Sequence, residues 1–261
     1  MTIGSSMYFI FNGVTSESMG IYNVNMESGM QKEPFSANRT IKEQKIRGND
    51  KPYFQEIELQ PLVLTVCFAF EDRWDSNKIR EVARWLLSPK YYVPLIFMED
   101  DDVSKIYYCL CVDSPELIHN GLSQGYINLK FRCVDAYAYT HYYNKTIDLS
   151  ANPSTGTIYS FENLGDEVCK PIIHINKIGD GRVSFINLSD GGTEFAIHNL
   201  LNKEIIVVDS EAEIIESNIP LTNRYKDIEG DFVGLRAWSI SNLLIKGTCE
   251  LKFTYQFKRL Q

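Results

Sequence analysis

Strict alternation of apolar and polar residues is the feature that most constrains what this chain can fold into. In the C-terminal segment CELKFTYQFK, every second residue from Cys249 to Phe257 is apolar or aromatic, and the residues between them are polar or charged. Successive side chains of a β-strand point to opposite faces, so this pattern predicts an antiparallel strand with one buried face and one face in water. The segment YINLKFRC (126–133) alternates in the same way. We therefore expect a mainly β fold.

One predicted strand differs from these because it is apolar on both faces. In LVLTVCFAF (62–70), the largest side chains fall on one face, and Val63, Thr65, Cys67 and Ala69 lie on the other. This composition is typical of a strand that is covered from both sides. We expect both faces of this strand to be buried.

One segment, about 76–88, shows the periodicity of an amphipathic α-helix. In DSNKIREVARWLLSP, Asp75 or Ser76 can cap the helix N-terminus, and Pro89 ends the helix. The apolar stripe between them has helical spacing and consists of Ile79, Val82, Ala83 and Leu86, flanked by Trp85 and Leu87. We expect one helix here.

The composition and the spacing of apolar runs change after Tyr143, which indicates two domains, 1–143 and 144–261. A loop rich in Ser, Pro, Thr and Gly (150–157) follows the change. Beyond it, short apolar runs alternate with turns such as GDG and DGG, a rhythm typical of an antiparallel β-sandwich. The segment EAEIIESN (211–218) could form a short helix, but VVDSEAEII is better explained as two strands joined by a turn.

The segment 31–53 of the first domain is polar and lacks clear periodicity. A compact domain seldom contains so long an irregular excursion, so we expect either a projecting hairpin or an arm that binds a partner. The first half of the chain is thus expected to combine a strand-rich core, one helix and a polar arm.

Composition and charge argue against several classes of protein. The 261 residues are 44% hydrophobic and 23% charged, as in ordinary globular proteins. The net charge of −8 is spread evenly, since the first half contains 14 basic and 18 acidic residues and the second half contains 12 and 16. Neither half carries the basic patch that binds a phosphate backbone. No apolar run reaches the roughly 20 residues of a membrane span, and the N-terminus lacks a signal-peptide pattern.

The residues that carry chemistry form no recognisable site. The six cysteines include no CxxC motif, so we expect reduced thiols that pack as small apolar side chains. The four histidines are far apart in the sequence, and no GxSxG or P-loop motif occurs. We predict no catalytic, metal-binding or cofactor-binding residue, no cofactor and no enzymatic activity. A hydrolase of another type stays open, because some of the 34 acidic residues will come close together by chance.

The acidic run Glu99–Asp102 could attract a divalent cation, since hard cations prefer several oxygen ligands. The run lacks the glycine turn and the distal glutamate of a calcium loop. We expect a solvent-exposed turn that joins two strands, PLIFM and SKIYYCLCV.

A cluster of aromatic residues, AYAYTHYY (136–143), follows the strand that ends at Cys133. The cluster could form a platform on which sugar rings stack. Aromatic residues beside a domain junction more often bury their rings between the domains and keep their hydroxyls at the wet edge. We therefore expect Tyr137, Tyr139 and Tyr142 to form a seam between the two domains, with sugar stacking as the alternative.

The order of these motifs resembles that of the distal tail proteins of long-tailed, non-contractile bacteriophages. The resemblance starts at MYFIFNGVTSESMGIY (7–22) and continues with KIRGNDKPYF, the long strand IELQPLVLTVCFAF and the helix IREVARWLLSP. It continues with IYYCLCVDSPEL and GYINLKFRCVDAYAY, in which Ala136 replaces the proline common in that family. The resemblance is good over residues 7–140 and looser beyond them, and it rests on the ordered set of motifs.

The resemblance implies a structural virion protein of the phage tail, assembled in the bacterial host cytoplasm. Its first domain would be a β-sandwich with a helix and a hairpin arm and would form a hexameric ring, while its second domain would be a galectin-like β-sandwich. The ring would be the hub of the tail tip or baseplate, with DNA passing through its channel and no membrane insertion. The implied partners are the tail tube protein, the tape-measure protein and the tail-tip, tail-associated or receptor-binding proteins. Candidate ring-interface residues lie on the arm: Arg39, Lys45, Arg47 and Tyr53.

A galectin-like domain raises the alternative of a carbohydrate-binding module that recognises host cell-surface glycans. Galectins use a His-x-Asn-x-Arg strand and a Trp-x-x-Glu-x-Arg strand. In this chain, Ile178 stands where the first arginine would be, and Ser241 stands where the glutamate would be. The polar groups that would hold a sugar are missing, so we expect the second domain to serve in docking or spacing.

Overall fold

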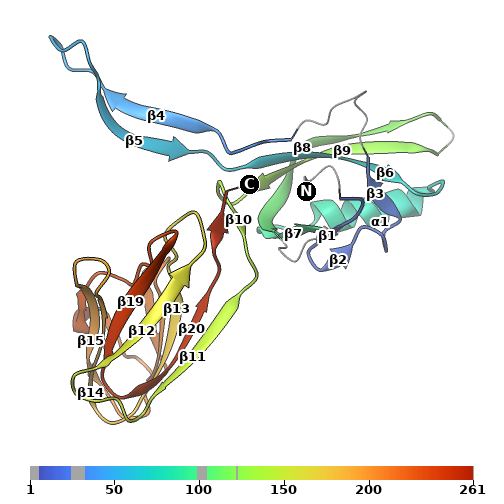
Figure 1. Ribbon diagram of the computed structural model, residues 1–261. Coiled ribbons are helices and arrows are strands. Elements are labelled where there is room, and N and C mark those ends of the chain that lie inside the picture. Colours follow the sequence, from blue (N-terminus) through green and yellow to red (C-terminus); the bar gives the residue numbers. More distant parts are fainter. Residues whose placement is uncertain (1–5, 25–32, 99–104, 122, 261) are drawn as a thin grey trace. The chain divides into compact units, whose positions relative to one another are not determined.

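The computed structural model describes residues 6–24, 33–98, 105–121 and 123–260, and the mainly β fold predicted by the alternating pattern is confirmed (Figure 1). The chain divides into two compact units, Met1–Thr140 with Leu260–Gln261, and His141–Arg259. The first unit contains the helix α1 (Ser76–Leu87) and the strands β1 (Phe9–Phe11), β2 (Val14–Thr15), β3 (Ile21–Asn23), β4 (Arg39–Gln44), β5 (Tyr53–Leu59), β6 (Val63–Phe70), β7 (Val93–Phe97), β8 (Ile106–His119), β9 (Gly125–Cys133) and β10 (Ala138–Tyr139).

Seven strands of the first unit form one antiparallel sheet in the order β2-β1-β7-β8-β9-β6-β3. Three strands separate β1 from β6 in this order, yet the ring centroids of Phe9 and Phe68 are only 4.4 Å apart. The sheet therefore bends over until its two ends face each other across the core, as the layers of a β-sandwich do. The Asn23 N–H donates to the Met7 carbonyl at 2.9 Å and ties the two ends together.

The helix predicted from the sequence is confirmed. Its N-cap is Asp75, whose carboxylate accepts a hydrogen bond from the Lys78 N–H at 2.8 Å. The buried side chains are Val82, Trp85 and Leu86. Leu87, which was expected to widen the apolar face, is exposed.

Trp85 is the residue that fixes the helix to the sheet. Its ring stacks on Phe9 with a centroid distance of 5.6 Å and meets Phe11 edge to face. Its indole N–H donates to the Phe11 carbonyl at 3.0 Å. Strand β1 thus provides both the packing partners of the Trp85 ring and the hydrogen-bond acceptor of its N–H.

The prediction that residues 62–70 are covered on both faces was wrong for this chain. In β6 the side chains of Leu64, Val66 and Phe68 are buried, but Val63 and Thr65 on the other face are exposed. Apolar residues on an outward face indicate a surface that needs a cover, and the sequence alone does not say whether the same chain supplies it.

The long strand expected over IELQPLVLTVCFAF is two strands, β5 and β6, separated by residues 60–62. Pro61 has no N–H to donate to a ladder. The Gln60 N–H donates to the Asn38 carbonyl and the Leu62 N–H donates to the Asp135 carbonyl, at 2.9 and 2.8 Å. The chain therefore leaves the sheet here, and the hairpin arm that precedes this point reaches to Leu59 rather than to Tyr53.

The turn expected at Glu99–Asp102 lies outside the described residues. The strands on either side of it, β7 and β8, do pair antiparallel, with Ile96 opposite Ile106.

The second unit is a two-layer antiparallel sandwich, as its short strands and glycine turns predicted. Its sheets have the strand orders β11-β20-β13-β16-β17 and β12-β19-β14-β15-β18. Phe253 of one sheet meets Phe161 of the other with ring centroids 4.6 Å apart. The elements are β11 (Tyr143–Leu149), β12 (Thr157–Asn163), β13 (Ile172–Lys177), β14 (Gly181–Asn187), β15 (Thr193–Leu200), β16 (Ile205–Asp209), β17 (Ile214–Ser217), the 3-10 turn η2 (Tyr225–Asp227), β18 (Ile228–Gly230), β19 (Ser239–Lys246), β20 (Cys249–Tyr255) and β21 (Lys258–Arg259).

Two finer predictions for this unit are also confirmed. In β20, Cys249, Leu251 and Phe253 face the core and alternate with exposed residues. The segment 211–218 contains the strand β17, which pairs with β16, and not a helix.

We expect Trp85→Phe to destabilise the first unit by about 1–2 kcal/mol, because the buried Phe11 carbonyl loses its indole donor while most of the ring packing is kept. Urea unfolding followed by far-UV circular dichroism measures the change. Trp74→Phe is the matched control, since the Trp74 ring is half-buried and packs on Phe70. An equal loss in both variants would contradict the role given to the Trp85 hydrogen bond.

Candidate assembly surfaces

The hairpin arm, β4 and β5, forms a two-stranded sheet of its own (Figure 1). Every residue of the two strands is exposed. A hairpin of two strands without packing is marginally stable in water. Exposed apolar residues on such an element indicate a surface that becomes covered in an assembly.

One face of the arm is apolar at its centre. Strand alternation places Ile41 on this face between Arg39 and Glu43, and Ile57 of β5 lies directly opposite Ile41. Leu59 follows on the same face, opposite Arg39. The exposed fractions of Ile41 and Ile57 are 60% and 42%, so the cross-strand pair is open to solvent. We call Arg39, Ile41, Glu43, Ile57 and Leu59 the apolar arm face.

The opposite face of the arm is charged and places one lysine between two glutamates. Lys42 lies opposite Glu56, and its Nζ is 2.8 Å from the Glu56 carboxylate and 3.5 Å from that of Glu58. The hydrogen bond with Glu56 raises the pKa of Lys42. A face with this set of paired charges is suited to water, which leaves the apolar arm face as the better candidate for contact with another protein.

The four interface residues expected from the resemblance all lie on this arm. Arg39 opens β4, and Lys45 and Arg47 lie in the exposed connection between the two strands. Tyr53 opens β5, is 55% exposed, and accepts a hydrogen bond from the Asn49 side chain at 3.3 Å. Their role in an interface stays a prediction.

Sequence reasoning missed the apolar residues of the arm, Ile41 and Ile57. The segment was characterised by its polar residues, and the expected arm ended before Ile57. The signal was present as alternation within RTIKEQ and YFQEIEL, but the two segments are short. Their cross-strand pairing, with Gln55 as a bulge residue, is what brings the apolar residues together.

Two of the three tyrosines of the expected seam lie against residues of the first unit. Tyr137 packs on the core of that unit. The Tyr139 hydroxyl donates to the Asp135 carboxylate, and its ring meets Tyr108 edge to face at 5.3 Å. Tyr142, at the start of the second unit, is exposed. The seam itself stays a prediction.

The two galectin-like near-matches do not form one site. His174 and Asn176 lie on β13 in one sheet of the sandwich, whereas Trp238 directly precedes β19 in the other. Outward side chains of two facing sheets point away from each other, so these residues cannot line one sugar pocket. Trp238 donates its indole N–H to the Asp166 carboxylate at 2.9 Å. The motifs therefore give no support to the carbohydrate-binding alternative.

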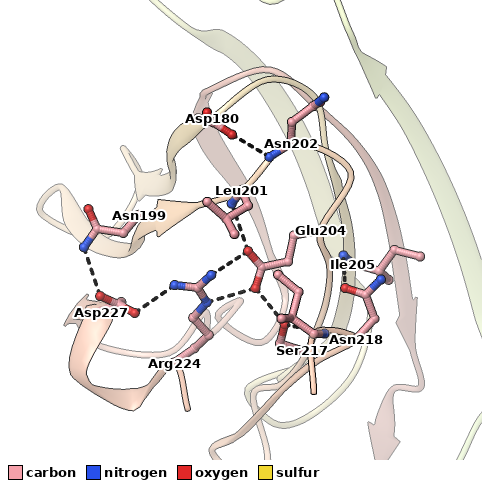
Figure 2. A network of polar contacts seen from close by, with 11 residues as sticks. Asp180, Asn199, Leu201, Asn202, Glu204, Ile205, Ser217, Asn218, Arg224 and Asp227 are labelled. Carbon is pink, nitrogen blue, oxygen red and sulfur yellow. Dashed lines mark hydrogen bonds and ion pairs between the residues drawn. The ribbon is translucent and has the colours of Figure 1, made fainter. Parts of the chain in front are cut away.

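A buried ion pair in the second unit has no counterpart in the sequence predictions (Figure 2). The Glu204 side chain is fully buried, and Arg224 donates to both of its oxygens, from Nε at 2.9 Å and from Nη2 at 2.7 Å. The Ser217 hydroxyl donates to the same carboxylate at 2.6 Å, and the Leu201 N–H does so at 2.9 Å. Four donors thus surround one carboxylate.

The network continues to a second carboxylate. Arg224 donates from Nη1 to Asp227 at 3.0 Å, and the Asn199 side chain donates to the other oxygen of Asp227 at 3.0 Å (Figure 2). Asp227 lies in the 3-10 turn η2, so the network fastens the connection between β17 and β18 to the end of β15 and the start of β16. Glu204 and Arg224 are 20 residues apart in the sequence, and Asn199 and Asp227 are 28 apart, which is why no local motif reveals the network.

Both carboxylates keep their charge in the folded protein. Burial by itself raises the pKa of Glu204, but the hydrogen bonds from Arg224, the Leu201 N–H and Ser217 outweigh it and lower the pKa. Hydrogen bonds from Asn199 and Arg224 lower the pKa of Asp227. A carboxyl group with a lowered folded-state pKa stabilises the fold above its ordinary pKa, and this contribution is lost as the pH falls through the lowered value.

The described residues hold no group of three or more His, Cys, Asp or Glu side chains that could bind a metal ion. Among the same residues, no helix has both the length and the apolar composition needed to cross a membrane. The cysteine side chains that are described are free thiols, and burial raises the pKa of Cys249 to about 11.

Comparison with known proteins identifies the class to which these two β units belong. Residues 5–135 match the family described as phage tail protein N-terminal domain, and residues 137–255 match the family described as phage tail C-terminal domain. The chain is thus a phage tail protein and belongs to this family. The SPbeta prophage-derived protein YomH of Bacillus subtilis (strain 168) is 32% identical to it over 263 residues, which cover 99% of this chain and 100% of YomH.

Solved structures confirm the resemblance to distal tail proteins at the level of the fold. The crystal structure of Dit (gp 19.1) of phage SPP1, described as a paradigm of the hub adsorption apparatus in Gram-positive infecting phages, gives a TM-score of 0.69 at 17% identity. The match covers 96% of this chain and 99% of Dit. A chain of the phage P2 baseplate in its activated conformation with Ca gives 0.54 at 9% identity, covering 97% of this chain and 98% of that chain.

We expect Glu204→Gln to destabilise the second unit by about 3 kcal/mol at neutral pH, because Arg224 becomes a buried charge with a weaker partner. The variant will also lose part of the fall in stability that the wild type shows as the pH drops below the ordinary pKa of a glutamate and through the lowered pKa of Glu204. Amide hydrogen exchange of peptides from residues 141–259 measures this unit alone. Glu250→Gln, an exposed position on β20, is the control and is expected to change the stability by less than about 0.5 kcal/mol.

Proposed function

We propose that this protein is a structural hub of the phage tail tip or baseplate, built as a hexameric ring that surrounds the channel for DNA exit. Membership of a phage tail protein family supports a tail location, and the fold likeness to SPP1 Dit over nearly the full length of both chains supports the hub role. The observation that carries the proposal is the exposed apolar arm face, which needs a protein partner.

Ring formation follows from the kind of interface that an arm makes. A cyclic ring requires two different, complementary patches on each copy. An arm that contacts a surface elsewhere on the next copy supplies this asymmetry, because the same contact then repeats in one direction around the ring. The expected interface residues Arg39, Lys45, Arg47 and Tyr53 belong to this arm.

In this proposal the ring joins the tail tube protein and the tape-measure protein on one side to tail-tip, tail-associated or receptor-binding proteins on the other. Assembly, rather than catalysis, is the work of the protein. DNA is a transient occupant of the channel, since a chain with a net charge of −8 offers little attraction to phosphates. The second unit serves in docking or spacing, and Tyr137, Tyr139 and Tyr142 set its position at the proposed seam.

The mass of the purified protein in solution tests this proposal. Size-exclusion chromatography with light scattering is expected to give a hexamer at high protein concentration, and negative-stain imaging is expected to show rings. A strict monomer at every concentration tested would overturn the proposal.

We expect removal of the arm to abolish ring formation while both units stay folded. Residues 40–58 can be replaced by a short Gly-Ser linker, because the Gln60 N–H donates to the Asn38 carbonyl at 2.9 Å and the two ends of the arm are therefore adjacent. Light scattering will then report a monomer, and far-UV circular dichroism will report a folded protein.

The control for this deletion is Lys42→Ala with Glu58→Ala, which changes only the charged face of the arm. This variant should form rings at protein concentrations similar to the wild type, because exposed ion pairs contribute little stability. A ring of normal size from the deletion variant would remove the arm from the assembly mechanism.

A further inference from the structure

The outward side of the bent sheet in the first unit is unusually apolar. In β7, Pro94 and Ile96 lie on the outward side between buried residues, and in β8, Leu110 and Val112 lie on the same side; all four are half-buried. An antiparallel sheet with one solvated face normally carries polar residues at such positions. An apolar outward face marks a contact with another protein surface.

The neighbouring strands continue this surface around one basic residue. Arg132 of β9 lies opposite Leu110 of β8 on one side and opposite Val63 of β6 on the other. Val63 and Val134 are each 43% exposed, and the Arg132 guanidinium donates to the Tyr92 hydroxyl. We call Val63, Tyr92, Leu110, Arg132 and Val134 the outer face.

We propose that the outer face of one copy receives the apolar arm face of the next copy in the ring. This inference rests on the proposed ring function and names the surface that completes it. Both surfaces have apolar centres, and Glu43, one of the two charged residues of the arm face beside Arg39, is opposite in charge to Arg132 of the outer face. Glu43 lies next to Ile41 on the arm, and Arg132 lies between Val63 and Leu110 on the outer face.

A second copy is the partner that these observations favour. Every residue of the arm is exposed in this chain, so the arm does not occupy the outer face of its own copy. The chain runs from β5 through residues 60–62 into β6, where Val63 belongs to the outer face. Each copy therefore carries both halves of the contact, and repetition of the contact in one direction produces a ring when the rotation between neighbouring copies closes.

Complementation between two defective variants tests this pairing. The arm variant is Ile41→Asp with Ile57→Asp, and the face variant is Val63→Asp with Val134→Asp, all at exposed positions. Each variant alone is expected to be a folded monomer by light scattering. An equal mixture is expected to give a one-to-one heterodimer and no ring, because only the intact arm of the face variant and the intact outer face of the arm variant can meet.

The outcomes of this mixture separate the two proposals. Rings from the face variant alone, at wild-type concentrations, would show that the arm docks elsewhere, whether on a sheet edge or on a different protein. Two monomeric variants that form no heterodimer would also overturn the pairing. A wild-type protein that forms no ring would instead overturn the proposed hub function.

A charge exchange gives an independent readout. Glu43→Arg and Arg132→Glu are each expected to raise the protein concentration needed for half-assembly by about tenfold, and the double variant is expected to recover most of this loss. Glu43→Arg with Lys130→Glu is the matched control, because Lys130 lies on the same strand as Arg132 and is paired with Asp113 at 3.1 Å. Equal recovery in the control, or no recovery with Arg132→Glu, would contradict contact between Glu43 and Arg132.

Discussion

The contact between Phe9 and Phe68 is the interaction on which the first unit depends. It holds the two ends of one sheet face to face, and Trp85 then joins the helix to the same rings. Because the inward positions of the sheet are filled by this aromatic core, the remaining apolar residues must point outward or lie on the arm. The described part of the first unit therefore leaves apolar side chains exposed, among them Ile41, Ile57 and Val63.

The second unit meets a different requirement, since its two sheets bury their apolar faces against each other. In addition to this apolar packing, the second unit contains a buried ion pair between Glu204 and Arg224 at the end of the sandwich. Burying two charges costs solvation free energy, and hydrogen bonds offset that cost only in a well-defined geometry. The pair thus favours one conformation of the connection between β17 and β18. A rigid domain of this kind suits a docking or spacing role.

The sequence predicted the strands well where backbone geometry sets the pattern. In β20 the period of two is strict, and the inward residues from Cys249 to Phe253 are those of the alternation. Asp75 and the apolar stripe of the helix are local signals too, so the helix was also predicted. The failures concern long-range partners. Whether Val63 is covered and whether Ile41 meets Ile57 depend on residues elsewhere in the fold, as the Glu204–Arg224 pair depends on the closed sandwich.

The arm also shows why docking on a face is favoured over strand pairing at an edge. Two exposed strands could extend a neighbouring sheet without limit and form fibres. The charged ladder around Lys42 and the bulge at Gln55 disfavour such pairing, because charges resist burial and a bulge disrupts the register that edge pairing needs. The apolar arm face has neither obstacle. A contact that uses this face leaves the strand edges unpaired and therefore does not extend a neighbouring sheet.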